Sequence, residues 1–258
     1  MTGKVRAKKE LGQHFLCDLT IAGDIVDALP EGCAERVVEV GPGMGVLTQY
    51  LIERKDFDFS VIELDGQSVD YLKKHYPEKL AGRIVEGDFL QMPFEPSTAV
   101  IGNFPYNIST QIFFHILDSR DSVPVVVGML QKEVAVRLAA PVGSREGGVL
   151  SVFLQAFYDV EYLFEVGAEK FSPPPKVQSA VIRCTRNGVS DLGCDEKLFR
   201  RVVKGAFSQR RKMLKNALYS SFQPLRDKKI QHEFFTRRAE NLSLGEFVEL
   251  TNFIEQNL

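Results

Sequence analysis

The sequence predicts an α/β protein with a doubly wound sheet, followed by a small domain made only of helices. Three observations support this prediction. Short apolar segments alternate with helical segments over most of the chain, a glycine-rich turn follows an early apolar segment, and the pattern after residue 187 is helical throughout. A chain of 258 residues suits one large domain and one small one. We therefore expect a first domain at 1–187 and a second at 188–258.

The expected strands of the first domain are short runs of apolar residues that suit a buried sheet. They cover 36–40, 59–65, 83–88, 99–102, 123–130 and 177–184. Helical periodicity follows in 46–52, 69–75 and 132–139. Strands that alternate with helices form parallel βαβ units, so the sheet should be largely parallel. Residues 185–194 contain Asn, Gly, Ser and Asp and are predicted to be the linker.

Composition places the chain among ordinary globular proteins, with 44% hydrophobic and 26% charged residues. No apolar run is long enough to span a bilayer, and no secretory leader is recognisable. The four cysteines are scattered, with no C-x-x-C pair and no histidine at metal-ligand spacing. We therefore expect a cytoplasmic protein with reduced surface thiols, no metal and no membrane contact.

Charge is distributed unevenly along the chain. The net charge is only −2, but residues 188–258 hold thirteen Lys or Arg and nine Asp or Glu, whereas the rest holds nineteen and twenty-five. A basic stretch without an acid comprises Lys197, Arg200, Arg201, Lys204, Arg210, Arg211, Lys212 and Lys215. It is either a solvated helix surface or a face that binds phosphates. The contrast with the acidic first domain favours RNA binding.

The glycine-rich turn spans 39–45 and has the sequence Glu-Val-Gly-Pro-Gly-Met-Gly. A dinucleotide fingerprint would need glycine at the position of Val46, so the spacing instead resembles the E-x-G-x-G-x-G loop of class I methyltransferases. This resemblance specifies the predicted sheet as Rossmann-like. We expect the backbone at Gly41, Gly43 and Gly45 to approach a cofactor.

Two acids end the next two predicted strands and complete the candidate cofactor site. Glu63 stands 22 residues after Gly41, where a carboxylate can accept hydrogen bonds from both ribose hydroxyls. Asp88 ends the third strand, where it can accept from the amino group of an adenine or simply cap the following turn. Parallel strands bring these carboxyl ends to one crevice.

Asn103, Phe104, Pro105 and Tyr106 follow the fourth strand and can hold an amine attached to an aromatic ring. The lone pair of such an amine is delocalised, and two hydrogen-bond acceptors favour the tetrahedral nitrogen that attacks a methyl donor. The Asn103 side chain supplies one acceptor. Pro105 restricts the residue before it and so directs the Phe104 carbonyl as the second. Tyr106 can stack on a base that has left its helix. The alternative is an ordinary turn.

Six motifs in one order resemble the KsgA-type rRNA adenine dimethyltransferases from about Lys9 almost to the end of the chain. They lie at 11–16, 39–45, 103–109, 130–133, 171–177 and 207–212. The resemblance implies transfer of methyl groups from S-adenosylmethionine to N6 of two adjacent adenosines in a hairpin loop near the 3′ end of 16S rRNA. It also implies that the protein binds this RNA within an immature small ribosomal subunit. It places the cofactor against His14, Leu16, Gly41, Glu63, Asp88 and Asn103.

The resemblance also implies that Phe171 stacks on the target adenine opposite Tyr106; the residue pattern alone favours a core anchor before three prolines. His14 stands where the family generally has Asn, and Phe104 where Leu is commoner. Other readings are a large-subunit rRNA methyltransferase of the macrolide-resistance type, an enzyme for DNA adenine or protein glutamine, and an assembly factor that mainly binds the immature subunit. We expect a monomer.

Overall fold

The structure is a computed structural model that describes residues 5–8 and 11–258. The chain forms two compact units, 1–135 with 160–186, and 136–159 with 187–258. The chain passes from the first unit to the second for the last time after residue 186, next to the predicted boundary. Residues 136–159 belong to the second unit, although they were predicted in the first. The reason is a packing contact between residues that are distant in sequence. The ring centroids of Phe153 and Phe199 lie 6.1 Å apart.

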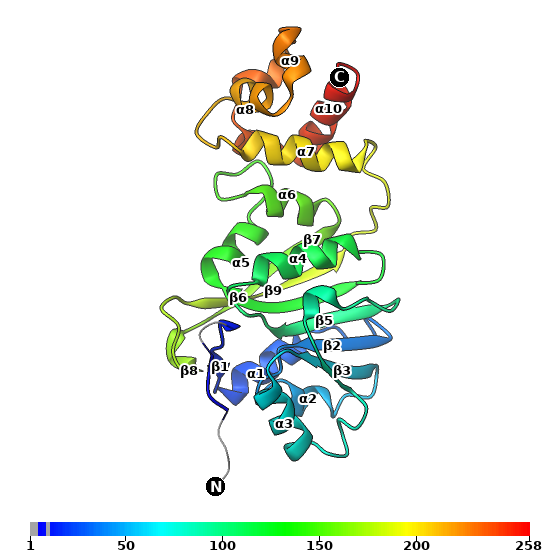
Figure 1. Cartoon of the computed structure of the whole chain (residues 1–258), viewed down its shortest axis with the longest axis vertical. Coiled ribbons are helices and arrows are strands. Elements are labelled where there is room, and N and C mark those ends of the chain that lie inside the picture. Colours follow the sequence, from blue (N-terminus) through cyan, green and yellow to red (C-terminus); the bar gives the residue numbers. More distant parts are fainter. Residues whose placement is uncertain (1–4, 9–10) are drawn as a thin grey trace. The chain divides into compact units, whose positions relative to one another are not determined.

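The first unit is built on a seven-stranded sheet with the strand order β4-β3-β2-β5-β6-β9-β7 (Figure 1). The strands are β2 Arg36–Val40, β3 Asp58–Glu63, β4 Ile84–Glu86, β5 Thr98–Asn103, β6 Val125–Gln131, β7 Tyr158–Val166 and β9 Ser179–Arg186. The five strands from β4 to β6 pair in parallel, and β9 is antiparallel to β6. The doubly wound prediction is confirmed. Strand β7 was not predicted, because its half-exposed residues form no buried run.

Helices of the first unit follow the strands. They are α1 Leu19–Asp27, α2 Thr48–Leu51, α3 Gly66–His75, α4 Ser109–Asp118 and the start of α5 Lys132–Ala139, with short 3-10 turns at Phe89–Gln91 and Ala168–Lys170. The Asp18 carboxylate caps α1 by accepting from the Thr20 and Ile21 amides. Ala22, Ile25 and Val26 of α1 join alternate residues of β2, β3, β5, β6 and β9 in one hydrophobic core. This core holds the strand ends in place.

The second unit is helical, as predicted for its C-terminal part. It contains α6 Val149–Gln155, α7 Glu196–Phe207, α8 Leu214–Ser221, α9 Gln223–Asp227, α10 Leu244–Glu255 and 3-10 turns at Glu233–Thr236 and Ala239–Asn241. Each long helix buries one apolar face, for example Val202 and Val203 of α7 and Leu250 and Ile254 of α10.

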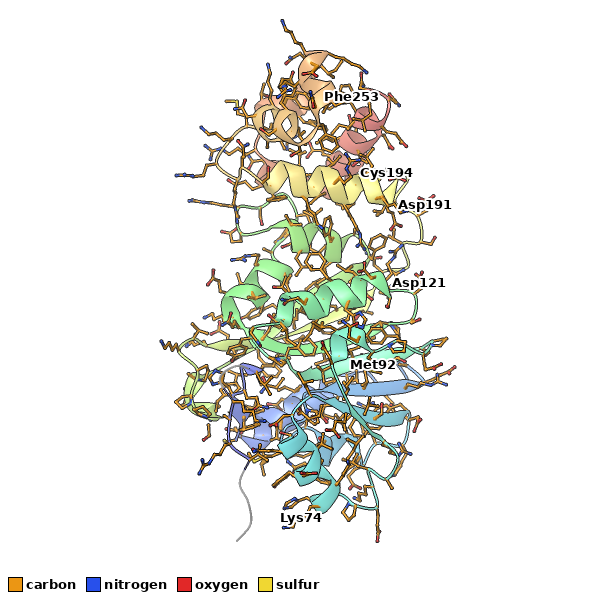
Figure 2. The ribbon with its side chains drawn as sticks, viewed as in Figure 1. Lys74, Met92, Asp121, Asp191, Cys194 and Phe253 are labelled. Atoms are coloured by element: carbon orange, nitrogen blue, oxygen red, sulfur yellow. The ribbon has the colours of Figure 1, made fainter. Side chains whose placement is uncertain are left out.

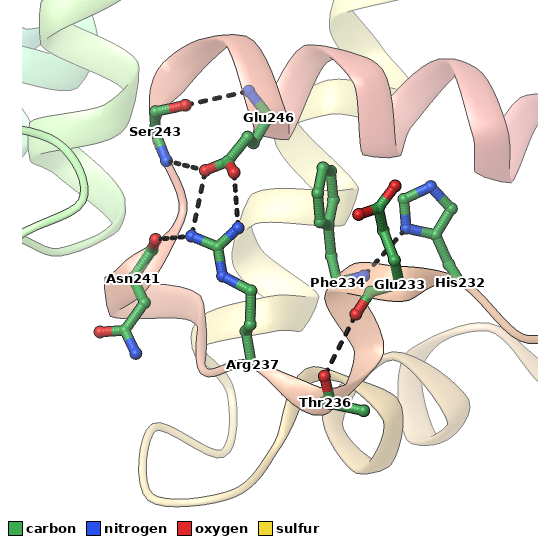
Figure 3. A network of polar contacts seen from close by, with 8 residues as sticks. All are labelled: His232, Glu233, Phe234, Thr236, Arg237, Asn241, Ser243 and Glu246. Carbon is green, nitrogen blue, oxygen red and sulfur yellow. Dashed lines mark hydrogen bonds and ion pairs between the residues drawn. The ribbon is translucent and has the colours of Figure 1, made fainter.

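The start of α10 is fixed by a capping box (Figure 3). The Ser243 hydroxyl accepts from the Glu246 amide, and the Glu246 carboxylate accepts from the Ser243 amide at 2.8 Å. Arg237 donates to the same carboxylate at 2.5 Å and also to the Asn241 carbonyl. These charge-assisted bonds lower the pKa of Glu246 and keep it ionised.

The cysteines lie apart, and all four are free thiols. Cys184 is buried in β9, which corrects the expectation that every cysteine lies at the surface. Burial raises its pKa, and burial together with nearby acids such as Asp195 raises the pKa of Cys194 to about 11. Cys194 lies just before α7 (Figure 2). Both groups are therefore protonated thiols at neutral pH.

The described residues form neither a membrane-spanning helix nor a cluster of metal ligands. Within 5–8 and 11–258, no helix has the length and apolar character needed to cross a bilayer. Over the same residues, no three side chains of His, Cys, Asp or Glu gather in a way that could hold a metal ion.

Candidate functional site

A pocket opens at the carboxyl edge of the sheet, where β2, β3 and β5 end. The parallel pairing brings these ends to one edge, as expected for a ligand crevice of an open α/β sheet. The pocket is lined by residues 11–15, by Val40, Gly41 and Gly43, by 62–64, by 87–90 and by 103–108. Five segments that are distant in sequence therefore meet here.

The glycine loop after β2 contributes backbone to this pocket. Gly41 and Gly43 have positive φ angles of 63° and 55°, which a residue with a side chain rarely adopts. A Cβ on Gly43 would also stand 2.9 Å from the Phe15 ring. Gly45, which we predicted to bind the cofactor, lies outside the pocket; a Cβ there would meet Tyr76 at 2.9 Å, so this glycine serves packing.

Glu63 is held rigidly at the end of β3. Its carboxylate accepts from the Gly43 amide at 3.0 Å and from the Asp65 amide at 2.9 Å, and the residue is 5% exposed. Burial raises the pKa of Glu63, while the two amide bonds oppose that rise. The same bonds tie the glycine loop to β3, which fixes the distance between the two predicted cofactor elements.

Asp88 lines the pocket from the segment after β4. Its Oδ1 accepts from the Leu90 amide at 2.9 Å and caps the turn Phe89–Gln91. The capping role considered as the alternative is therefore present. It does not use Oδ2, so it is compatible with a second bond to a ligand in the pocket.

Asn103 ends β5 and is oriented by the N-terminal segment. Its Nδ2 donates to the His14 carbonyl at 2.9 Å. A carbonyl can only accept, so the amide NH₂ has to face His14. The Asn103 Oδ1 is then the atom of this amide that can accept a hydrogen bond in the pocket. The structure thus gives the predicted acceptor a fixed orientation.

The side chain of Phe104 points into the core and is fully buried. Its ring fills the space above two glycines of the sheet. A Cβ on Gly128 would stand 2.4 Å from the ring and one on Gly102 3.2 Å from it. The Phe104 amide donates to the Met129 carbonyl at 2.9 Å. The segment after β5 is thereby anchored to β6, while Pro105 and Tyr106 line the pocket.

His14 lies beside Tyr106 at the pocket. The two rings stack with centroids 5.4 Å apart and an interplanar angle of 30°. The His14 Nδ1 is 2.8 Å from the Pro173 carbonyl. Leu16, predicted to touch the cofactor, lines only a smaller adjoining cavity and is 4% exposed. Successive side chains of an extended chain face opposite ways, so Phe15 reaches the pocket and Leu16 joins the core.

Phe171 does not lie at the pocket, contrary to the role implied by the resemblance. It is in β8 (Phe171–Ser172), which pairs with β1 (Phe15–Leu16), and is 4% exposed within the hydrophobic core. The ring anchors the proline-rich loop, as the residue pattern alone favoured. In this conformation the ring is not available for stacking on a base.

The site also involves three residues that were not predicted, Asp65, Lys8 and Gln13. The Asp65 carboxylate accepts from Lys8 Nζ at 2.6 Å and from Gln13 Nε2 at 3.3 Å. Burial raises the pKa of Asp65, but the hydrogen bonds from Lys8 and Gln13 outweigh this and the net effect is a lowered pKa. These bonds fasten the N-terminal segment over the pocket. The sequence feature that could have indicated this contact is Asp65 itself, an acid two residues after Glu63.

The predicted RNA-binding residues differ in their surroundings. Four of these side chains are exposed, those of Arg201, Lys204, Arg211 and Lys212. Two others are half-buried, those of Arg200 and Lys215. The Arg200, Arg201 and Lys215 cations lie over the rings of Phe153, Phe222 and Tyr219 respectively. Arg210 donates to the carbonyls of Arg145 and Gly147 and pairs with Glu240 at 3.4 Å. Arg210 therefore holds a loop, which sequence could not show.

Glu39, the acid of the glycine motif, makes stability depend on pH. It is 1% exposed, and burial raises its pKa to about 8, although Thr48 Oγ1 donates to it at 2.6 Å. A carboxyl whose pKa is raised on folding stabilises the protein fully below its ordinary pKa of 4.5 and loses that contribution as pH rises through 8.

Glu39→Gln removes this titration. The free energy of unfolding of the variant, relative to that of the unmodified protein, should therefore rise progressively between about pH 4.5 and pH 8. Urea unfolding of both proteins across this range, without cofactor, measures the difference. A difference that stays constant with pH would contradict the prediction.

The sheet order, the glycine loop and the acid at the end of β3 define a class I methyltransferase fold. Residues 4–256 match the family described as ribosomal RNA adenine dimethylase. The chain therefore belongs to the ribosomal RNA adenine dimethylase family. The predictions of an enzyme and of its family are confirmed.

Relatives named ribosomal RNA small subunit methyltransferase A match over nearly their full length. The one from Porphyromonas gingivalis is 52% identical, with 98% of this chain and 99% of the relative covered. The one from Cytophaga hutchinsonii is also 52% identical, with 97% and 98% covered. The one from Parabacteroides distasonis is 53% identical, with 98% and 96% covered.

Two solved structures share the fold. A dimethyladenosine transferase from Plasmodium falciparum superposes with a TM-score of 0.78 at 23% identity, covering 95% of this chain and 98% of that one. The 23S rRNA methyltransferase ErmE gives a TM-score of 0.66 at 23% identity, covering 91% and 99%. At these identities the likeness concerns the fold.

Proposed function

We propose that the protein transfers methyl groups to N6 of two adjacent adenosines in a hairpin loop near the 3′ end of 16S rRNA, within an immature small subunit. Family membership supports adenine dimethylation, and the relatives at 50% identity or more are named for the small subunit. The observation that carries the chemistry is Asn103, whose amide NH₂ donates to the His14 carbonyl, so that the amide oxygen is left to accept a hydrogen bond.

The pocket suits S-adenosylmethionine as the methyl donor. When bound, this cofactor supplies an electrophilic methyl group on a sulfonium. Gly41 and Gly43 let the backbone approach it closely, and Glu63 can accept from its ribose hydroxyls. Asp88 can accept from its adenine amino group through Oδ2, because Oδ1 is used by the cap.

The residues after β5 position the target amine. In the first transfer Asn103 Oδ1 and the Phe104 carbonyl can accept its two N–H groups, which favours the tetrahedral nitrogen whose lone pair can attack the methyl. In the second transfer one N–H remains for these acceptors. Each time the carbon–sulfur bond would break as the carbon–nitrogen bond forms, and the nitrogen would then release one proton. Tyr106 offers a ring face on which the flipped adenine stacks. No side chain has to act as a nucleophile. Catalysis consists of positioning and electrostatic preorganisation.

The direct test offers small and large ribosomal particles with cofactor carrying a labelled methyl group and maps the modified base. We expect two dimethylated adenosines in the small-subunit RNA. Label in large-subunit RNA would support the macrolide-resistance alternative. Tight binding to immature small subunits without methyl transfer would support the assembly-factor alternative.

The basic face of the second unit is proposed to hold RNA phosphates. Arg211→Glu with Lys212→Glu should weaken binding to immature small subunits and reduce the slope of log affinity against log salt by about 2. Both residues are exposed, whereas Arg210 would be a poor choice because its loss also releases the loop at Arg145.

A matched control is the exposed pair Lys73 and Lys74 of α3, the second of which is labelled in Figure 2. Their reversal changes the net charge equally, and we expect binding to stay close to that of the unmodified protein. Salt titrations of filter binding measure both variants. Equal losses in the two would mean that only total charge matters and would refute a specific face.

We further propose that the protein works as a monomer in the cytoplasm. The proposed substrate is small-subunit RNA, and substrate and enzyme have to share one compartment. Light scattering of the purified protein with and without cofactor measures the first of these proposals.

A further inference from the structure

Ser179 is a buried polar residue that the proposed mechanism leaves unused. It is the first residue of β9, is fully buried, and pairs with Gln131 in the antiparallel register of β6 and β9. A buried hydroxyl without a partner is costly, so its partner has to be identified. That partner is the phenol of Tyr106, whose oxygen is 2.5 Å from Ser179 Oγ.

This hydrogen bond connects the sheet to the ring that we propose stacks on adenine. Tyr106 has its backbone in the segment after β5 and its hydroxyl on β9, two strands away. A ring tied at both ends cannot swing about its Cα–Cβ bond. Burial raises the pKa of Tyr106, an effect that the Ser179 bond only partly offsets, so the phenol is neutral at physiological pH.

One face of the tethered ring is already covered. His14 stacks on Tyr106 at 5.4 Å and 30°, and the His14 ring is itself fixed by the Pro173 carbonyl at 2.8 Å. A flat base that stacks on Tyr106 therefore has to use the opposite face. The tilt of that face determines where the amine of the base lies relative to Asn103.

We propose that Ser179 is a positioning residue for methyl transfer: its hydroxyl sets the plane of Tyr106, and through it the angle at which the target adenine meets the methyl donor. This inference rests on the proposed function of the pocket. Ser179 touches neither reactant and acts only through the phenol. A role in stability alone is the alternative that an experiment has to separate.

The experiment is a double-mutant cycle of Ser179→Ala and Tyr106→Phe, which remove the same bond from its two ends. Each variant should lower kcat about ten-fold, because an adenine stacked on a displaced ring meets the methyl donor at a poorer angle, and should leave KM for S-adenosylmethionine unchanged. The double variant should be no slower than either single one. Additive losses, or kcat unchanged in both, would overturn the proposal.

A second readout reports base stacking directly. RNA with 2-aminopurine at the target adenosine loses fluorescence when the base stacks on an aromatic ring, and Ser179→Ala should quench it less than the unmodified protein. Equal quenching would overturn the proposal. If Ser179→Ala does not fold, Tyr106→Phe tests the same bond while keeping the ring.

Ser151→Ala is the matched control for loss of a buried hydroxyl. Ser151 is fully buried and donates to the Arg137 carbonyl at 2.5 Å within the second unit. It should lose thermal stability with kcat unchanged for the folded enzyme. All variants are assayed on the RNA that the unmodified protein methylates. If the proposed substrate is wrong, the unmodified protein itself fails to methylate small-subunit RNA. If only the role of Ser179 is wrong, the unmodified protein methylates that RNA and the double-mutant cycle alone departs from the expected result.

Discussion

Asn103→Ala should abolish methyl transfer, lowering kcat by at least two to three orders of magnitude, the loss seen when one oriented hydrogen-bonding group of an active site is removed. The variant loses the acceptor for the target amine and also the bond from Nδ2 to the His14 carbonyl. RNA binding should stay largely intact, because the predicted phosphate contacts lie on the second unit. Transfer of labelled methyl to immature small subunits, with binding measured in parallel, checks both expectations.

Asn252→Ala is a suitable control for this experiment. Asn252 also donates its Nδ2 to a backbone carbonyl, that of Gly193, at 3.0 Å; it belongs to α10 and is not among the residues that line the pocket. Its loss should leave methyl transfer unchanged. Full transfer by Asn103→Ala would refute the proposed mechanism.

Gly128→Ala should strongly impair the enzyme although Gly128 lies inside a regular strand and touches no reactant. The new methyl group would stand 2.4 Å from the Phe104 ring. The ring cannot retreat easily, because it is fully buried and meets Phe113 edge-on at 5.9 Å. Overpacking of this kind costs about 1–3 kcal/mol of stability. Movement of Phe104 also shifts its neighbours Asn103 and Pro105, and a displacement of about 1 Å can cost on the order of 100-fold in rate.

Phe104→Leu should rescue Gly128→Ala, because the shorter side chain makes room for the methyl group. Alone, Phe104→Leu leaves part of the space unfilled, so we expect a modest loss of stability with most activity retained. Thermal unfolding and kcat of the two single variants and the double variant measure the rescue. If Gly128→Ala behaves like the unmodified protein, or if Phe104→Leu fails to improve it, the steric argument is wrong.

The sequence was sufficient for the residues that follow strand ends. Gly41, Gly43, Glu63, Asp88 and Asn103 were all predicted in one crevice, and the pocket brings them together. The physical reason is that parallel strands with helical crossovers put every carboxyl end on the same edge. Apolar runs in the sequence locate such strands, and the polar residue after each run then lies at the carboxyl edge of the sheet.

Residues whose position depends on a distant partner could not be predicted in this way. Phe171 was given a stacking role only by the family resemblance, whereas the residue pattern favoured the core position that the structure shows. Arg210 was predicted to contact phosphate, and the structure shows that it holds a loop. Segment 136–159 joined the second unit because its apolar side chains are buried there. In each case the local sequence was compatible with both outcomes.

The sequence by itself therefore determined the parallel strands of the sheet, the residues at their carboxyl ends and the family, because strand patterns and glycine spacing are local properties of the chain. The tertiary structure alone decided how the reactive groups are held. The bonds from Asn103 to the His14 carbonyl, from Lys8 to Asp65 and between Tyr106 and Ser179 join residues 89, 57 and 73 positions apart. Such pairs leave no periodic trace in a sequence, since only the folded backbone brings their atoms within hydrogen-bonding distance.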